Sequence, residues 1–313
     1  MRDIDLLAIG SPIVDNIIHI DEDFIHAITG KKGGMELIDY TVLSELLCQT
    51  GQGIVMPGGS AANVARCFAS LGGSCRFVGK IGDDIAGSYF RRQMKIAKVI
   101  PQLMIDKNTH TAQVVSLVTP DGERTMRTYL GAAATINPEE LQAESFRDVN
   151  IVHTEGYTLT NSNLTETIFK LANKAKCKIS LDLSSFEIVN DFQQRLEKIL
   201  PSVEILFANE DELQTYGLGS IEKGFKQLAL MCPIVVGMLG ENGCAIHSEG
   251  KLQYFHTSPV KAIESTGAGD FFASGFLYGF CHRKPIETCA KYAMQLGAAV
   301  VKSEGAAIQK IKI

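Results

Sequence analysis

One segment combines small residues with a terminal carboxylate: Ser265-Thr266-Gly267-Ala268-Gly269-Asp270 leads directly into an apolar, helix-like stretch, 271–276. Small residues before a helix leave backbone N–H groups free to converge on an anion, and the helix dipole adds to the attraction. A carboxylate beside such an anion cradle suits phosphoryl transfer, because it accepts the proton of a hydroxyl while the cradle holds the transferring charge. Taken alone, the motif is explained more simply by Asp270 capping the helix.

A second candidate segment is Pro57-Gly58-Gly59-Ser60-Ala61-Ala62-Asn63-Val64-Ala65. Its two glycines allow the backbone to approach a ligand closely, and Asn63 offers both a donor and an acceptor, which suits sugar hydroxyls. The simpler alternative makes Ser60 the N-cap of a helix. That helix is indicated by apolar residues at helical spacing, followed by a glycine pair: Val64, Cys67, Phe68, Leu71 and then Gly72-Gly73.

The elements that must position these segments alternate in type along the second half of the chain. Strands recurring with one intervening helix indicate βαβ units, whose right-handed crossovers cover both faces of a mostly parallel sheet. With 313 residues, 45% of them hydrophobic, the chain can bury one large core. We therefore expect a doubly wound α/β fold in a single domain, 1–313. The expected strands are 151–155, 179–183, 205–208 and 234–236, and the expected helices are 164–176, 192–200 and 221–230.

Two regions depart from this alternation. Between residues 111 and 130, two β-rich runs flank Thr119-Pro120-Asp121-Gly122, whose proline and glycine favour a hairpin turn. Residues 13–20 and 34–39 are also β-rich, with no helical crossover expected between them. A few antiparallel strands beside a parallel sheet indicate a small lid. We expect it to be formed by inserted segments at about 13–40 and 108–131.

Other catalytic motifs are absent from the sequence. It contains no G-x-x-x-x-G-K-[ST], no G-x-G-x-x-G, no H-E-x-x-H, no G-x-S-x-G and no protein-kinase catalytic loop. A dinucleotide-dependent oxidoreductase therefore loses its main support.

The composition excludes further classes. Lys plus Arg total 30 against 35 Asp plus Glu, a formal net charge of −5, so the chain lacks the cationic surface of a dedicated nucleic-acid binder. No apolar stretch reaches the length of a membrane span, and the first apolar run is too short for a signal peptide. The eight cysteines show neither C-x-x-C pairs nor metal spacing. We expect a cytoplasmic protein without structural zinc, nucleic acid or membrane partners.

Together, the two glycine-containing segments resemble the two signatures of the ribokinase/PfkB family of carbohydrate and nucleoside kinases. Their order and separation also fit that family. Further stretches are similar to its first strand with a substrate-gripping Asp, its N-x-x-E motif and its glycine turn beside the nucleotide. These stretches are Gly10-Ser11-Pro12-Ile13-Val14-Asp15, Asn209-Glu210-Asp211-Glu212 and Leu239-Gly240-Glu241-Asn242-Gly243.

The resemblance implies a role for each matching residue. Asp270 is the general base, and the preceding small residues form the anion cradle. Asn209 and Glu212 organise Mg²⁺, through water because the ion keeps its hydration shell, although a polar strand-to-helix turn is the alternative. Met238 stands where the family often has a polar residue. The implied sets are Gly267, Ala268 and Gly269 for the cradle; Ser11, Asp15, Gly59, Ser60, Asn63, Arg124 and Glu155 for the substrate; and Asn209, Leu239, Gly240, Gly243 and Thr266 for the nucleotide.

Within the family, several stretches resemble the adenosine-kinase-like branch, among them 119–126 and Glu155-Gly156-Tyr157. This implies an ATP- and Mg²⁺-dependent kinase of the primary hydroxyl of a nucleoside, with adenosine as the first candidate. Arg124 and Arg127 then reach the substrate or phosphates on lid closure. The alternatives are a kinase of a free sugar, such as ribose or fructose, and a non-catalytic ligand sensor. The expected partner is a small molecule, and the expected assembly is a monomer or homodimer.

Overall fold

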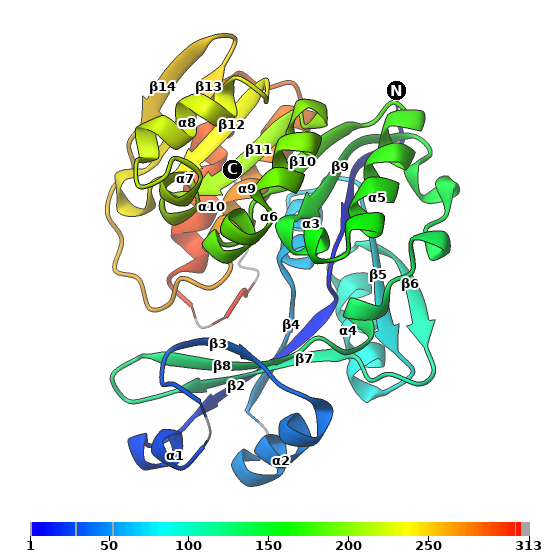
Figure 1. Ribbon diagram of the computed structural model, residues 1–313, viewed down its shortest axis with the longest axis vertical. Coiled ribbons are helices and arrows are strands. Elements are labelled where there is room, and N and C mark those ends of the chain that lie inside the picture. The colour runs from blue at the N-terminus through cyan, green and yellow to red at the C-terminus, as the bar shows by residue number, and fades with distance from the viewer. Residues whose placement is uncertain (1, 29, 52, 304, 308–313) are drawn as a thin grey trace.

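The computed structural model describes residues 2–28, 30–51, 53–303 and 305–307 (Figure 1). Within them, nine strands form a large sheet in the order β14-β13-β12-β11-β10-β9-β1-β5-β6. All neighbours from β12 to β6 are parallel, whereas β13 and β14 extend one edge in antiparallel fashion. These strands are β1 (Ile4–Ile9), β5 (Cys75–Gly82), β6 (Ile100–Asp106), β9 (Val149–Glu155), β10 (Lys178–Asp182), β11 (Ile205–Asn209), β12 (Ile234–Met238), β13 (Cys244–Ser248) and β14 (Lys251–Phe255).

Helices cover both faces of this sheet, which confirms the doubly wound α/β arrangement. Consecutive residues of a strand point to opposite faces, so Leu6 and Leu7 of β1 lie in two different cores. Helices α5, α6, α7 and α8 pack on the Leu7 side, and α3, α4, α9 and α10 on the Leu6 side. Their bounds are α3 (Ser60–Ser70), α4 (Ile85–Ile96), α5 (Ser162–Lys174), α6 (Phe186–Ile199), α7 (Glu210–Tyr216), α8 (Ile221–Ala229), α9 (Ala268–Cys281) and α10 (Ile286–Val300).

The helix expected at 192–200 begins six residues earlier. Ser185 is the N-cap of α6, and its hydroxyl oxygen accepts the N–H of Ile188 at 3.3 Å. The helix also tolerates a non-helical residue at Phe192 (φ −120°). The apolar spacing after Phe192 therefore identified only the second part of a longer, irregular helix.

A second sheet of five strands, in the order β3-β8-β7-β2-β4, lies below the large one in Figure 1. The expected hairpin is present: β7 and β8 are antiparallel, and Gly122 (φ +84°) donates its N–H to the Thr119 carbonyl at 2.8 Å. Helices α1 and α2 pack against one face of this sheet. The bounds are β2 (Ile13–His19), β3 (Gly34–Leu37), β4 (Ile54–Gly58), β7 (Ala112–Val118), β8 (Arg124–Tyr129), α1 (Glu22–Ala27) and α2 (Tyr40–Thr50).

Three details expected of the small sheet are wrong. It is mixed rather than antiparallel, because β2 pairs with β7, and β3 with β8, in parallel. A helix, α1, lies in the chain between β2 and β3, where no helical crossover was expected. Its strands also extend beyond the expected segment 13–40, since β4 pairs with β2. The first inserted segment therefore runs to Gly58, immediately before α3.

Among the described residues, none of the helices combines the length and apolar character needed to cross a lipid bilayer.

Candidate active site

A cavity of about 360 Å³ lies where the carboxyl ends of β10, β11 and β12 meet the start of α9 and one face of the second sheet. The carboxyl ends of parallel strands are the usual place for ligands in open α/β sheets. Of the residues singled out in the sequence, the cavity wall brings together Asp15, Gly59, Ser60, Asn63, Arg124, Asn209, Glu212, Thr266, Gly267, Ala268, Gly269 and Asp270. It does not include Ser11, Glu155, Leu239, Gly240 or Gly243.

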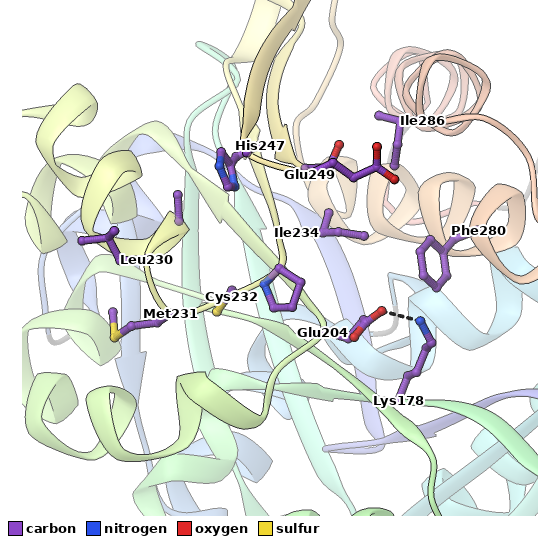
Figure 2. Close-up of a pocket in the computed structure, with 14 residues that line it drawn as sticks. Lys178, Glu204, Leu230, Met231, Cys232, Ile234, His247, Glu249, Phe280 and Ile286 are labelled. Carbon is purple, nitrogen blue, oxygen red and sulfur yellow. Dashed lines mark hydrogen bonds and ion pairs between the residues drawn. The ribbon is translucent and has the colours of Figure 1, made fainter.

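A larger cavity, of about 630 Å³, lies at the opposite, amino-terminal ends of β10 and β12 (Figure 2). Its charged pair, Lys178 and Glu204, is mutually neutralised by an ion pair. Much of the remaining lining is apolar, including Leu230, Phe280 and Ile286. The smaller cavity is therefore the better candidate for the active site, because several carboxylates, an arginine and the N-terminus of a helix line it.

Asp270 occupies the first turn of α9 at the wall of the smaller cavity. Its Oδ1 accepts the hydroxyl of Ser60 at 2.7 Å, and its Oδ2 accepts Nδ2 of Asn63 at 2.9 Å. Burial raises the pKa of Asp270, and these two hydrogen bonds oppose that rise. The interpretation of Asp270 as a simple helix cap is wrong, because Gly267 is the N-cap and the Asp270 carboxylate bonds to α3 instead.

The start of α9 has the form of an anion cradle. Gly267 is left-handed (φ +78°), a conformation natural to glycine, and it has no side chain to accept the first N–H groups of the helix. The N–H of Ala268 donates to the Ser265 carbonyl at 3.0 Å within the turn. The helix behind this turn is 14 residues long, so its dipole favours an anion at this end.

The start of α3 also differs from the simple N-cap interpretation of Ser60. Gly59 is the N-cap, at φ +94°, and a Cβ there would lie 2.0 Å from the carbonyl oxygen of Ser11. A side chain at this position is therefore excluded both by conformation and by space. Ser60 becomes the first helical residue, and its hydroxyl donates to Asp270.

Asp15 of β2 lies on the cavity wall opposite the large sheet. Burial raises its pKa to about 6, while the positive charges of Arg124 and Arg66 oppose the shift and Asp270 adds to it. Gly58 allows this approach, since a Cβ on it would lie 2.2 Å from Oδ2 of Asp15. The two carboxylates thus line one cavity from different elements, Asp15 from β2 and Asp270 from α9.

Asn209 and Glu212 form a reciprocal capping box at the start of α7. The Glu212 N–H donates to Oδ1 of Asn209 at 2.9 Å, and the Asn209 N–H donates to Oε2 of Glu212 at 2.8 Å. Nδ2 of Asn209 also donates to Oε1 of Glu212 at 2.8 Å. The alternative interpretation, a polar strand-to-helix turn, is therefore correct as local structure, although both residues also line the cavity. Burial raises the pKa of Glu212 to about 7.

Asp182, at the end of β10, is a cavity residue that the sequence analysis missed. Burial raises its pKa, and the nearby charges of Glu212 and Asp270 raise it further. Ser184 and Tyr157 were missed in the same way. The sequence did contain a signal for this site, because Asp182 lies near the carboxyl end of the expected strand 179–183 and Ser184 follows it directly. The carboxyl ends of neighbouring parallel strands, here those of β10 and β11, lie at the same edge of the sheet.

Glu155 and Ser11 lie behind the cavity wall. Glu155 is 1% exposed, and its two carboxylate oxygens accept the backbone N–H groups of Ser11 (2.9 Å) and Ala61 (3.0 Å). These contacts hold together two of the connections between the sheets, the one from β1 to β2 and the one from β4 to α3. Glu155 and Ser11 thus connect segments of the backbone and do not line the cavity.

The two arginines of β8 point to opposite faces of the second sheet. Nε of Arg124 donates to Oγ of Ser116 at 2.8 Å, and its Nη1 contacts Thr266 and forms an ion pair with Glu264. Arg127, three residues later, lies away from the cavity and pairs with Glu36 at 3.7 Å. Alternation along the strand therefore brings Arg124, but not Arg127, to the site.

The model of the pfkB family of carbohydrate kinases matches residues 29–312. This chain belongs to the pfkB family. The match covers both glycine-containing segments that shape the cavity, and it confirms the family expected from them.

Relatives of this pfkB-family chain are kinases of sugars and nucleosides. It is 27% identical to a nucleoside kinase of Methanothermobacter thermautotrophicus, over 97% of this chain and 91% of that protein. It is 30% identical to an ATP-dependent ribose-1-phosphate kinase of Halopiger xanaduensis, over 80% and 81%. A probable sugar kinase from Rhizobium etli shares its structure with a TM-score of 0.90 at 30% identity, covering 98% and 95%. An adenosine kinase from Sinorhizobium meliloti gives 0.89 at 29%, covering 97% and 95%. The chain is thus an ATP-dependent kinase of the sugar and nucleoside class.

The glycine turn of this pfkB-family chain follows β12 directly. The Leu239 N–H donates to the Gly243 carbonyl at 2.9 Å, closing a short turn over 240–242. Met238, the residue before it, reaches the cavity and lies 3.6 Å from a Cβ built on Gly269. Met238 therefore lines the cavity, whereas the residues of the turn that follows it do not.

Proposed function

We propose that this pfkB-family kinase transfers the γ-phosphoryl group of ATP to the primary hydroxyl of a nucleoside, with adenosine as the first candidate acceptor. The observation that carries the proposal is the position of Asp270: a carboxylate at a helix N-terminus, in the same cavity as Asp15. The similarity to an adenosine kinase and to a nucleoside kinase, each near 30% identity, favours a nucleoside.

In the proposed reaction, Asp270 accepts the proton of the primary hydroxyl as its oxygen attacks the γ-phosphorus. The bond from the γ-phosphorus to the bridging oxygen breaks, and ADP leaves. Backbone N–H groups at the start of α9, around Gly267 and Gly269, stabilise the negative charge of the transferring group. The raised pKa of Asp270 makes it a stronger base than an ordinary aspartate.

The proposed reaction also uses Mg²⁺. Asp182, Asn209 and Glu212 present carboxylate and amide oxygens, the donors this ion prefers, at the ends of two neighbouring strands. Burial raises the pKa of Asp182, the nearby charges of Glu212 and Asp270 raise it further, and a cation would relieve that repulsion. Bound there, Mg²⁺ would neutralise phosphate charge of the nucleotide. Asn209 and Glu212 would hold it through water, since their capping contacts already occupy their polar atoms.

On the acceptor side, Asp15 and Asn63 bind and orient the sugar hydroxyls. Both residues line the cavity, Asp15 from β2 and Asn63 from α3. The second sheet acts as a lid, with the face that carries Val114, Ser116 and Met126 turned to the acceptor. Closure of such a lid excludes water, which otherwise would take the phosphoryl group.

A free sugar is the second candidate acceptor. It is favoured by the probable sugar kinase from Rhizobium etli, whose TM-score is 0.90, and by probable fructokinases of Arabidopsis thaliana at 28% identity. A sugar needs only the hydroxyl-binding side of the cavity. A nucleoside must also place its base, and the described wall offers apolar side chains such as Val114 and Met126 for this.

One assay separates these candidates: ADP release from Mg·ATP over a panel of nucleosides and sugars. The proposal predicts the highest kcat/KM for a ribonucleoside, with adenosine first. A higher kcat/KM for fructose or ribose would establish the sugar alternative. Tight nucleoside binding without ADP release would instead favour a non-catalytic sensor.

A further inference from the structure

Arg66 is a buried cation that the proposed reaction does not use. It lies on α3, one turn after Asn63, and is 6% exposed. Within the described residues its hydrogen-bond acceptors are uncharged: the Pro57 carbonyl at 2.7 Å, Oδ1 of Asn63 at 3.1 Å and the Ala306 carbonyl at 3.5 Å. A buried guanidinium without a directly bonded carboxylate is costly, so its position needs an explanation.

The contact with Asn63 fixes which way that amide faces. Oδ1 of Asn63 accepts from Arg66, so Nδ2 points to the other side, where it donates to Oδ2 of Asp270 at 2.9 Å. An amide turned by 180° would present its oxygen to the Asp270 carboxylate and its N–H₂ group to a cation. Arg66 therefore selects the one orientation in which Asn63 donates to the proposed base.

Arg66 also joins the chain segments that surround this base. The Pro57 carbonyl lies at the end of β4, just before the glycine pair, and the Ala306 carbonyl lies in the segment next to Gly267. Nη1 alone bridges Pro57 and Asn63. The planar fork of arginine makes such divergent contacts, whereas the point charge of a lysine does not.

The positive charge of Arg66, like its hydrogen bond to Asn63, favours ionised carboxylates in the cavity. It lowers the pKa of Asp15 and so opposes the burial of that carboxylate. Burial lowers the pKa of Arg66 itself only to about 10, so the guanidinium stays charged at neutral pH. The cavity thus has a permanent positive charge behind its wall.

We propose that Arg66 is a positioning residue for phosphoryl transfer: through Asn63 it orients and holds ionised the carboxylate of Asp270. The inference rests on the proposed role of Asp270 as general base.

The main test replaces Arg66 by methionine, which keeps an unbranched apolar stem but removes the charge and the donors. We expect kcat to fall about 10- to 100-fold, because small misplacements of a catalytic group have effects of this size. The acid limb of the pH–rate profile should move to higher pH, since Asp270 loses an oriented donor. Other titratable groups near Asp270 are Asp15, Glu155, Tyr157, Asp182 and Cys67, so the same profile is recorded for the control.

The matched control is Arg76→Met. Arg76 of β5 also donates to a backbone carbonyl, that of Ser145, but it does not line the cavity. Its variant should keep the wild-type kcat and acid limb. If Arg66→Met behaves like Arg76→Met, the positioning role is wrong.

A double-mutant cycle with Asn63→Ala tests whether Arg66 acts through Asn63. We expect the double variant to lose little more than Asn63→Ala alone, whereas fully additive losses would overturn the proposal. Arg66→Lys covers the case in which the methionine variant does not fold. It should keep the acid limb near its wild-type position but lower kcat several-fold, and wild-type kcat in this variant would also overturn the proposal.

The same experiments separate this inference from the proposed function. If Asp270→Asn retains more than half of kcat, Asp270 is not the base, and both proposals fail together. If Asp270→Asn is inactive while Arg66→Met matches its control, only the role of Arg66 is wrong.

Discussion

Arg124 of the second sheet forms an ion pair with Glu264, which lies in the segment leading to the α9 turn. The two side chains are 15% and 11% exposed, so the pair is shielded from water and salt. The other carboxylate oxygen of Glu264 accepts the N–H of Gly305 at 2.7 Å. One carboxylate thus connects the proposed lid, the approach to the anion cradle and the C-terminal segment.

Breaking this ion pair should loosen the lid. In Glu264→Gln we expect backbone amides of β7 and β8 to exchange faster than in the wild type, because Arg124 loses its charged partner. Glu222→Gln is the matched control, since Glu222 pairs with Lys226 on the exposed surface of α8. Hydrogen exchange followed by mass spectrometry measures the difference, and equal rates in both variants would contradict the role of the ion pair.

Acceptor binding should slow exchange in the second sheet. Closure over the substrate protects the hairpin of β7 and β8 and the strands β2 and β3, whereas the central strands of the large sheet are protected already. The measurement compares the free protein with protein at saturating acceptor. Unchanged exchange in both segments would mean that a preformed cavity, rather than a moving lid, excludes water.

Asp270→Asn should lower kcat by about 10²- to 10⁴-fold, the usual effect of losing a general base. Ligand binding should remain nearly intact, because an amide keeps the size of the carboxylate. Steady-state kinetics and calorimetric titration with acceptor measure the two properties separately. Asp191→Asn, at an exposed position of α6, serves as the control. A variant with more than half of the wild-type kcat would exclude Asp270 as the base.

Asp15→Ala should raise KM strongly and also lower kcat if, as proposed, Asp15 binds and orients neighbouring hydroxyls of the acceptor. A deoxy acceptor lacking those hydroxyls should be a poor substrate of the wild type. With this deoxy acceptor, Asp15→Ala should lower kcat/KM little further. Kinetics of both proteins with both acceptors complete the cycle, and fully additive losses would show that Asp15 does not contact these hydroxyls.

Asp15→Asn should stabilise the protein above pH 6. Burial raises the pKa of Asp15 from 3.8 to about 6, so the folded state binds its proton more tightly than the unfolded chain does. The stability from this proton is therefore complete below about pH 4 and is lost as the pH rises through 6. The variant should gain about 3 kcal/mol at pH 8 and almost nothing at pH 4, measured by urea unfolding. Equal gains at both pH values would refute this origin.

Asp182→Asn should raise the Mg²⁺ concentration that gives half-maximal activity. Removal of one carboxylate weakens the oxygen donor set, while Asn209 and Glu212 keep their capping contacts. Activity is measured against Mg²⁺ at fixed ATP, with Asp191→Asn as control. An unchanged Mg²⁺ dependence would place the ion elsewhere.

The sequence predicts strands β9 to β12 of the large sheet because each βαβ unit there is local. Strands and helices from Val149 onward follow one another with clear periodicity, so their order could be deduced from short windows. The second sheet could not be deduced in this way. Its strands β2 and β7 pair across most of the first third of the chain, and β4 is a short strand next to a glycine pair. Nothing local specifies such partners.

The site residues, too, fall into those that the sequence could predict and those that it could not. Asp270 and Asn63 stand in short motifs whose residue types indicate their chemistry. The structural role of Glu155 and the position of Arg66 could not be predicted in this way, because charged residues are normally assigned to a solvated surface. Their roles arise from burial against backbone groups of distant segments, which only the assembled fold brings together.

The position of Glu155 also has a consequence for the order in which the chain assembles. Ser11 and Ala61 leave the ribosome early, whereas the carboxylate that accepts both of their N–H groups follows Ala61 by 94 residues. The contact that joins these two connecting segments therefore forms only after both have been synthesised. A nascent chain that stalls before β9 exposes the unjoined segments to proteases and chaperones.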